Sequence, residues 1–331
     1  MPRYPGHEKT PSVGRRQSDG TVAPFPGDAW NEWRRGDSGR DAFVYVNGMH
    51  VFSDDTVWCV DQGALRADSA PPRLATPKPG AQKLVQLDPA SGEVLEVIRF
   101  DDDILPAQAK MNDLRIHGST AYITDSGIGA IIVHDLNTGT TLRRLSGAAE
   151  MQAEDSADGS ASASASTGAH KTPKSDMIEV SNDGKWLYWA APTGPLRRIR
   201  TSLITDRSLT DSDLVPHIEK VADIPKSGGC SIDTLGNFYF SDLEHKQIVV
   251  RAPDGRTAVL AGDPELVSPD GSFISADRHL YVPATQSERT KLFGNPRDMT
   301  VKPFRIYTCE LPTEYAGIRL GDAVTGSVTP S

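Results

Sequence analysis

Short segments of alternating apolar and polar residues recur along the chain, in pairs joined by a polar turn. Alternation over a few residues predicts a β-strand, so each pair predicts two antiparallel strands. The pairs are 47–51 with 57–61, 112–116 with 121–125, 176–180 with 186–190, 228–232 with 238–242, and 270–274 with 280–284. Repetition of such units at intervals of roughly 40–65 residues predicts a β-propeller.

Further hairpins predict the outer strands of the blades. Apolar runs joined by turns of Asp, Asn, Pro and Gly occur at 83–87 and 93–98, 131–135 and 141–145, and 247–251 and 257–260. We therefore expect an all-β, single-domain, six-bladed β-propeller. The sixth blade would combine residues 304–311 with the segment around Trp30, because closure by both termini protects sheet edges that an open ring leaves unpaired.

The predicted propeller occupies residues 25–313. Residues 1–24 are rich in Pro, Gly and charged side chains, so we expect this segment to be disordered. Residues 149–173 contain a Ser/Ala repeat with nothing to bury, which predicts a low-complexity surface loop. Residues 314–331 are expected to form a polar C-terminal tail.

Composition excludes some classes of function. The formal net charge is −9 and no run of basic residues occurs, so nucleic-acid binding is not expected. No apolar stretch is long enough to span a membrane, and the N-terminus lacks the apolar core of a secretory signal. We expect a cytoplasmic protein whose partner is a small molecule, with its oligomeric state left open.

The first position of each unit is the main candidate for chemistry. Inner strands of a propeller converge on the axis, so Asn47, Asn112, Asp176 and Asp270 are expected to lie close together, whereas Gly228 supplies no side chain. Two carboxylates and two amides would begin a calcium site, and paired carboxylates also suit acid–base chemistry. The alternative is that these side chains only bind backbone amides in the turns.

A second set lies three positions further along each first strand: His50, Arg115, Glu179, Ser231 and Phe273. Charged side chains on an inner strand must be paired, so the structural interpretation is an Arg115–Glu179 ion pair between blades. The functional interpretation makes His50 a proton shuttle, Arg115 an anchor for an anionic or enolate oxygen, and Glu179 a base. Asp113, Ser231, Phe273 and the ring-forming Asn47, Asn112 and Asp270 would bind substrate, with Asp176 joining the catalytic set.

Several segments of the chain carry a family resemblance: Ala29–Trp33, Ala42–Asn47, Val57–Gly63, Asn112–Arg115, Ala121–Gly127, Asp176–Tyr188 and Ser227–Asp233. In these segments the chain resembles the major royal jelly/yellow family, most closely its microbial branch, which is often labelled dopachrome-tautomerase-related. The resemblance covers roughly residues 25–311 and implies a six-bladed propeller without fixing a substrate. More distantly, the chain is similar to gluconolactonase/regucalcin propellers, which hold a divalent metal at the ring centre with Glu, Asn and Asp side chains. That likeness points to Asn47, Asn112, Asp176 and Asp270, but the Glu of that metal site has no counterpart.

Three functions follow from these observations. The first is an isomerase, tautomerase or cyclase, including a pericyclic cyclase, that acts on an aromatic, quinoid or polyketide-like substrate in secondary or pigment metabolism. It requires positioned acid–base groups and no cofactor. The second is a lactonase or related hydrolase that depends on calcium or another divalent metal. The third is a propeller that binds a ligand or partner without catalysis.

Overall fold

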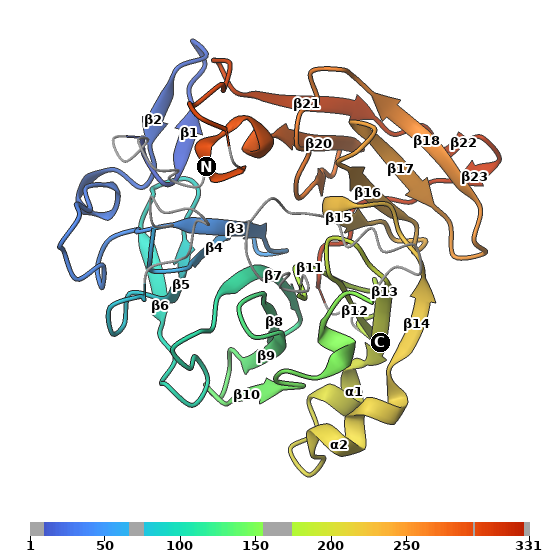
Figure 1. Ribbon diagram of the computed structural model, residues 1–331, viewed down its shortest axis with the longest axis horizontal. Helices are drawn as coiled ribbons and strands as arrows, with labels where there is room; N and C mark the ends of the chain where they lie inside the picture. Colours follow the sequence, from blue (N-terminus) through green and yellow to red (C-terminus); the bar gives the residue numbers. More distant parts are fainter. Residues whose placement is uncertain (1–9, 66–75, 155–173, 294, 328–331) are drawn as a thin grey trace.

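Five β-sheets surround a common axis in the computed structural model, which describes residues 10–65, 76–154, 174–293 and 295–327 (Figure 1). The sheets follow one another around this axis in sequence order, and we call them blades 1 to 5. The predicted all-β propeller is therefore confirmed as the class of fold.

The first four blades each contain four antiparallel strands in sequence order. Blade 1 consists of β3 (Val46–Val51), β4 (Val57–Asp61), β5 (Lys83–Leu87) and β6 (Val94–Ile98). Blade 2 consists of β7 (Met111–His117), β8 (Thr120–Asp125), β9 (Ala130–Asp135) and β10 (Thr141–Arg144). Blade 3 consists of β11 (Met177–Val180), β12 (Trp186–Ala190), β13 (Leu196–Arg200) and β14 (Glu219–Ala222). Blade 4 consists of β15 (Ser227–Ile232), β16 (Phe238–Asp242), β17 (Gln247–Arg251) and β18 (Thr257–Gly262).

Blade 5 has three strands, β19 (Phe273–Ile274), β20 (His279–Ala284) and β21 (Arg305–Glu310). The helices are short: α1 (Thr201–Ile204) and α2 (Asp211–Leu214) connect β13 to β14, and 3-10 turns occur at Asp28–Asn31, Ala149–Met151, Val215–His217, Ser287–Arg289 and Lys291–Phe293. Within the described part of the chain, no helix is long and apolar enough to cross a membrane.

Alternation along the inner strands decides which side chains fill the spaces between blades. Leu114 and Ile116 of β7 are buried against blade 1, and Ile178 of β11 is buried against blade 2. The side chains between these apolar positions, Arg115 and Glu179, therefore lie on the opposite faces of their strands. The pattern that builds the core thus also determines where the inner charges lie.

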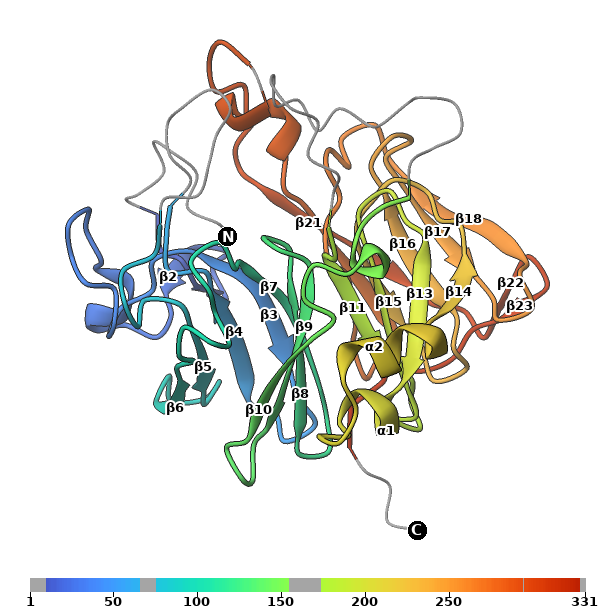
Figure 2. The same cartoon turned by 60° about the horizontal axis from the view of Figure 1, so that its bottom comes forward.

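The prediction of six blades is wrong, because the residues that the structure describes form five blades around the axis, seen from a second side in Figure 2. Residues 304–311 do supply a strand, but β21 pairs with β20 as the third strand of blade 5. Trp30 does not join it; its ring lies 5.1 Å from that of Phe43 and packs beside blade 1. The strands β1 (Gly14–Arg16) and β2 (Val22–Pro24) form a separate two-stranded sheet. The N-terminal segment thus covers blade 1 and does not complete a further blade.

Both ends of the chain differ from the expected disordered segment and free tail. Residues 10–24 contain β1 and β2, while residues 1–9 lie outside the described part. At the other end, β22 (Glu314–Tyr315) and β23 (Ile318–Arg319) form a hairpin whose Ile318 is buried against blades 4 and 5. Ala323 then pairs with Asp233 of blade 4, and the Gly326 carbonyl accepts a hydrogen bond from Gly118 of blade 2. This segment is held by burial and hydrogen bonds across one end of the propeller. Of the expected loop at 149–173, residues 155–173 also lie outside the described part.

Candidate functional site

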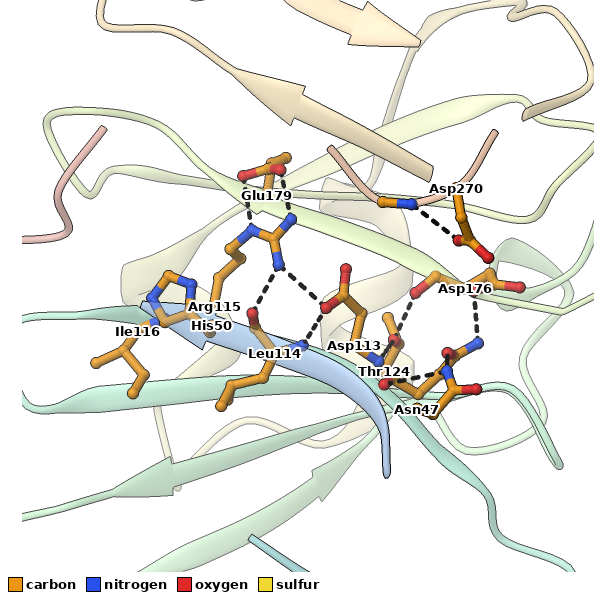
Figure 3. A network of polar contacts seen from close by, with 12 residues as sticks. Asn47, His50, Asp113, Leu114, Arg115, Ile116, Thr124, Asp176, Glu179 and Asp270 are labelled. Atoms are coloured by element: carbon orange, nitrogen blue, oxygen red, sulfur yellow. Dashed lines mark hydrogen bonds and ion pairs between the residues drawn. The ribbon is translucent and has the colours of Figure 1, made fainter. Parts of the chain in front are cut away.

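Irregularities at the start of the inner strands position the first set of predicted residues. We call Asn47, Asn112, Asp176 and Asp270 the ring. The register of β3 shifts next to Asn47, and that of β7 shifts across Asn112. A bulge inserts an extra residue and re-aims the neighbouring side chains, which is why bulges are frequent beside functional sites. The close-up in Figure 3 shows how ring side chains from several blades gather in one region.

Three members of the ring form a continuous chain of hydrogen bonds. The amide of Asn47 donates to the side-chain oxygen of Asn112. The amide of Asn112 in turn donates to a carboxylate oxygen of Asp176, and also to the hydroxyl of Ser126 at 3.1 Å. Both amide hydrogens of Asn112 are thus used to hold its neighbours. The arrangement fixes the Asp176 carboxylate at the axis through residues of blades 1 and 2.

Asp270 extends the ring but is more exposed than the other members. Figure 3 draws it beyond Asp176, at the opposite end of the network from Asn47. Its carboxylate accepts a hydrogen bond from the amide of Gly271 at 2.8 Å. Gly228 occupies the corresponding position of blade 4. Only glycine fits there without a shift of the backbone, because a Cβ on Gly228 would lie 2.1 Å from the carbonyl oxygen of Pro269. Backbone contact here replaces a side chain.

The second set of residues contains a buried ion pair. Arg115 binds both carboxylate oxygens of Glu179, through Nε at 3.0 Å and Nη2 at 2.7 Å (Figure 3). Its remaining terminal nitrogen donates to Asp113 at 3.1 Å and to the Leu114 carbonyl at 2.8 Å. The predicted Arg115–Glu179 pair is therefore present in the structure. Because protein acceptors engage all three guanidinium nitrogens, the structure does not favour Arg115 as an anchor for a substrate anion.

Burial changes the protonation of this group. Glu179 is 5% exposed, and its burial raises the pKa to about 7 against the opposing attraction of Arg115. Burial alone would lower the pKa of Arg115, but Asp113 and Glu179 outweigh it and raise that pKa. One guanidinium is thus shared between two carboxylates, so a proton on Glu179 is tolerated near neutral pH.

His50 lies next to this group without joining the ion pair. Its Nε2 is 3.4 Å from the backbone amide of Ile116, which donates to it. Burial, assisted by the positive charge of Arg115, lowers the pKa of His50 to about 3. An imidazole with this pKa stays neutral at pH 7, which does not favour the predicted role as a proton shuttle.

The other two members of the second set lie apart from the ion pair. Ser231 is buried and its hydroxyl lies 2.8 Å from that of Ser272, so it links blade 4 to the residue that precedes the first strand of blade 5. Phe273 is 45% exposed on the face of blade 5 that does not contact blade 4.

Two hydroxyls that the sequence analysis did not select position the ring. Thr124 donates to the backbone carbonyl of Asp176 at 2.6 Å and accepts from the amide of Asp113 at 3.1 Å. Ser241 donates in the same way to the carbonyl of Asp270 at 2.7 Å. Each hydroxyl precedes an aspartate that ends a second strand, so the repeated Thr-Asp and Ser-Asp pairs were the signal that identifies them.

The donor set fits a divalent cation only in part. Two carboxylates and two amide oxygens are hard ligands of the type that calcium prefers. The side-chain oxygen of Asn112, however, already accepts a hydrogen bond from Asn47. Among the residues that the structure describes, no group of three or more His, Cys, Asp or Glu side chains is arranged to hold a metal.

Comparison with known proteins identifies a family. The family profile described as "Major royal jelly protein" matches residues 45–319. A search of curated proteins finds no match. The profile does not distinguish branches of the family, so the dopachrome-tautomerase-related branch stays a prediction.

Several solved structures are similar to the chain at low sequence identity. A Bacteroides thetaiotaomicron protein of unknown function is 13% identical with a TM-score of 0.45, and the match covers 72% of this chain and 52% of that one. Streptogramin B lyase is 14% identical with a TM-score of 0.45, covering 81% and 68%. A gluconolactonase from Xanthomonas campestris is 15% identical with a TM-score of 0.47, covering 74% and 70%. The chain thus spans about half the length of the first of these proteins.

Proposed function

The chain belongs to the major royal jelly protein family, and we propose that it is an enzyme that isomerises, tautomerises or cyclises a small molecule at the ring. One observation carries this proposal: Asn112 donates a hydrogen bond to the carboxylate of Asp176 and is itself held by Asn47 of the neighbouring blade. A positioned carboxylate is what proton transfer to and from carbon requires.

The charges of the site restrict the substrate. Asp113, Asp176, Glu179 and Asp270 supply four carboxylates, and Arg115 supplies one guanidinium whose nitrogens are already engaged. An excess of negative charge repels an anionic substrate and stabilises a neutral or cationic one. We therefore assign a neutral aromatic, quinoid or polyketide-like molecule with a carbonyl group and an acidic C–H bond.

The chemistry needs only a single carboxyl group. Asp176 takes a proton from one position of the substrate while the electron pair moves into the adjacent carbonyl. The same carboxyl group returns a proton at another position, so the product is a tautomer and no proton is gained or lost overall. Asn112 positions Asp176, and the Arg115–Glu179 pair joins the inner strands of blades 2 and 3.

Proton exchange with solvent tests this proposal directly. A panel of neutral cyclic diketones, quinones and naphthols is incubated with the enzyme in D2O and followed by NMR and ultraviolet absorbance. We expect deuterium incorporation or isomerisation with the natural chain and its loss in Asp176→Asn. The matched control is Asp254→Asn, which alters an exposed carboxylate in an outer turn of blade 4. Equal rates for Asp176→Asn and the natural chain, or no binding of any panel member, would refute the proposal.

A second candidate function is a hydrolase, such as a lactonase, that uses calcium or another divalent cation. The oxygen-rich ring and its excess of carboxylates favour this candidate. If a cation is bound, Asp176 and Asp270 would be its charged ligands, and the cation would polarise a substrate carbonyl. Isothermal titration with Ca²⁺ should then show binding that Asp176→Asn and Asp270→Asn each weaken. Absence of binding to the natural chain would leave the acid–base proposal alone.

A further inference from the structure

Blade 1 and blade 5, the first and last blades of the propeller, leave apolar side chains exposed on the faces that do not contact another blade. Along β3, Met49 and Val51 share a face, and this face points away from blade 2. In blade 5, Phe273, Tyr281 and Ile306 share the face that points away from blade 4, because they alternate with the buried Leu280 and Val282. We call Met49, Val51, Phe273, Tyr281 and Ile306 the seam. These five side chains are between 37% and 68% exposed.

The N-terminal segment covers only part of this region. Val13, Phe25 and Trp30 pack on blade 1 against Cys59, Val85 and Leu87, which belong to its second and third strands. The cover also reaches Val46, at the beginning of β3, and it ends before Met49 is buried. Figure 1 shows β1 and β2 at the periphery, between blade 1 and blade 5. Among the residues that the structure describes, the N-terminal cover thus reaches the second and third strands of blade 1, while Met49 and Val51 on its inner strand stay exposed.

The seam is continuous with the ring along the chain. Met49 lies two residues after Asn47 on β3, and Phe273 lies three residues after Asp270 at the start of blade 5. In blade 1 and in blade 5, a polar side chain of the ring is thus followed along the chain by an apolar side chain of the seam. A ligand that extends from the ring between the first and last blades would meet a polar end and then an apolar surface.

We propose that the seam binds the apolar body of the substrate while its reacting carbonyl group lies at the ring. This inference rests on the proposed function and narrows its substrate to an amphiphilic molecule with a flat, aromatic or polycyclic body. Phe273 and Tyr281 form a cross-strand pair, and such a pair offers a rigid surface for stacking. The continuity of the seam with the ring favours the body of a small molecule that already lies at the ring over a second folded chain.

The inference is tested with N-phenyl-1-naphthylamine, a neutral aromatic probe whose fluorescence rises in apolar surroundings. We expect saturable binding to the full chain and at least tenfold weaker binding by Phe273→Ala and by Met49→Ala, a change equivalent to about 1.4 kcal/mol. Phe273→Tyr, which keeps the aromatic ring, should recover most of the affinity. The matched control is Leu95→Ala on β6, because Leu95 is 46% exposed but lies outside the seam. Thermal unfolding of each variant verifies that it is folded.

Asp176→Asn separates this inference from the proposed function. The apolar probe does not need the carboxylate, so its affinity should change less than twofold in Asp176→Asn while turnover is lost. Unchanged probe affinity in Phe273→Ala and Met49→Ala, or no saturable binding to the natural chain, would overturn the seam but leave the ring chemistry standing. Sedimentation of a stable dimer that Phe273→Ala dissociates would also overturn it, because a second copy would then cover the seam. Retained turnover in Asp176→Asn with weakened probe binding in the seam variants would refute only the ring chemistry.

Discussion

The buried ion pair makes a prediction in which two opposing effects are compared by magnitude. Burial raises the pKa of Glu179, and Arg115, which binds it at 2.7 and 3.0 Å, lowers it. The net result is a rise from the ordinary value of 4.5 to about 7. A difference of one pKa unit corresponds to about 1.4 kcal/mol, so this shift is equivalent to about 3 kcal/mol of stability.

The sign of the effect follows from proton linkage. Because the pKa of Glu179 is raised in the folded state, its protonation stabilises the folded state. This contribution to the free energy of unfolding is fully present below about pH 4.5 and is lost as the pH rises through about 7. His50 acts in the opposite direction, since its lowered pKa gives a contribution that is lost as the pH falls below about 6.5. The total stability of the natural chain therefore mixes the two effects, and a comparison with a variant is needed to isolate Glu179.

Glu179→Gln supplies that comparison. Glutamine resembles protonated glutamate in shape and still accepts a hydrogen bond from Arg115. The free energy of unfolding of the natural chain, minus that of Glu179→Gln, should fall by about 3 kcal/mol between pH 4.5 and pH 8. Urea denaturation followed by circular dichroism at several pH values measures this difference. Arg115→Met is the complementary variant: at pH 8 it should cost about 3–5 kcal/mol, because Glu179 and Asp113 lose their counter-charge.

The same measurement can refute the reasoning. A difference that rises with pH would mean that the attraction of Arg115 exceeds the effect of burial and holds Glu179 ionised throughout. A difference that does not depend on pH would mean that the folded and unfolded states bind protons equally at this position. Either result would remove the claim that one guanidinium shared by two carboxylates tolerates a proton near neutral pH.

Three further changes test how the fold holds the ring. In the natural chain the ammonium group of Lys83 lies 2.8 Å from the buried carboxylate of Asp61. Lys83→Met should lower the free energy of unfolding by about 3–5 kcal/mol in urea titrations, because it leaves this carboxylate buried without a counter-charge. Gly228→Ala should lower the melting temperature through overpacking against the Pro269 carbonyl, at a cost of about 1–3 kcal/mol, whereas Gly271→Ala, where nothing lies within 4 Å, should not. Thr124→Val should cost about 1–3 kcal/mol of stability and also reduce turnover, because the hydroxyl loses its hydrogen bonds to the Asp176 carbonyl and to the Asp113 amide. A Thr124→Val variant with normal turnover would show that the backbone of Asp176 needs no such support.

Local sequence patterns predicted the strands but could not determine how many blades form the propeller. Alternation identifies inner strands because residues such as Leu114 and Ile116 must be buried against a neighbouring blade. The number of blades depends instead on contacts between distant segments. Trp30 is as well suited to cover blade 1 as to enter a sixth blade, and only its packing on Phe43 shows which occurs. The resemblance to a six-bladed family reinforced the same error.

The candidate site was predictable in its membership and less so in its chemistry. Asn47, Asn112 and Asp176 are recognisable as the first positions of repeated units, and the pairing of Arg115 with Glu179 follows from the need to neutralise inner charges. Burial of Glu179 and the engagement of every guanidinium nitrogen depend on three-dimensional packing that a repeat pattern does not encode. The raised pKa of Glu179 and the engagement of every nitrogen of Arg115 could therefore not be derived from the sequence.

These electrostatic details change which substrates suit the ring. If Arg115 were free, an anionic or enolate oxygen would be the natural group to place beside it. With its nitrogens bound to Asp113, Glu179 and a backbone carbonyl, the cluster offers a substrate no unshared positive charge. A carboxylate or phosphate on the substrate would approach Asp176 and Asp270 without compensation, whereas a neutral carbonyl would not. The charge of the site thus favours a substrate whose reacting group is neutral. The exposed apolar side chains of the seam favour an apolar body for the same substrate.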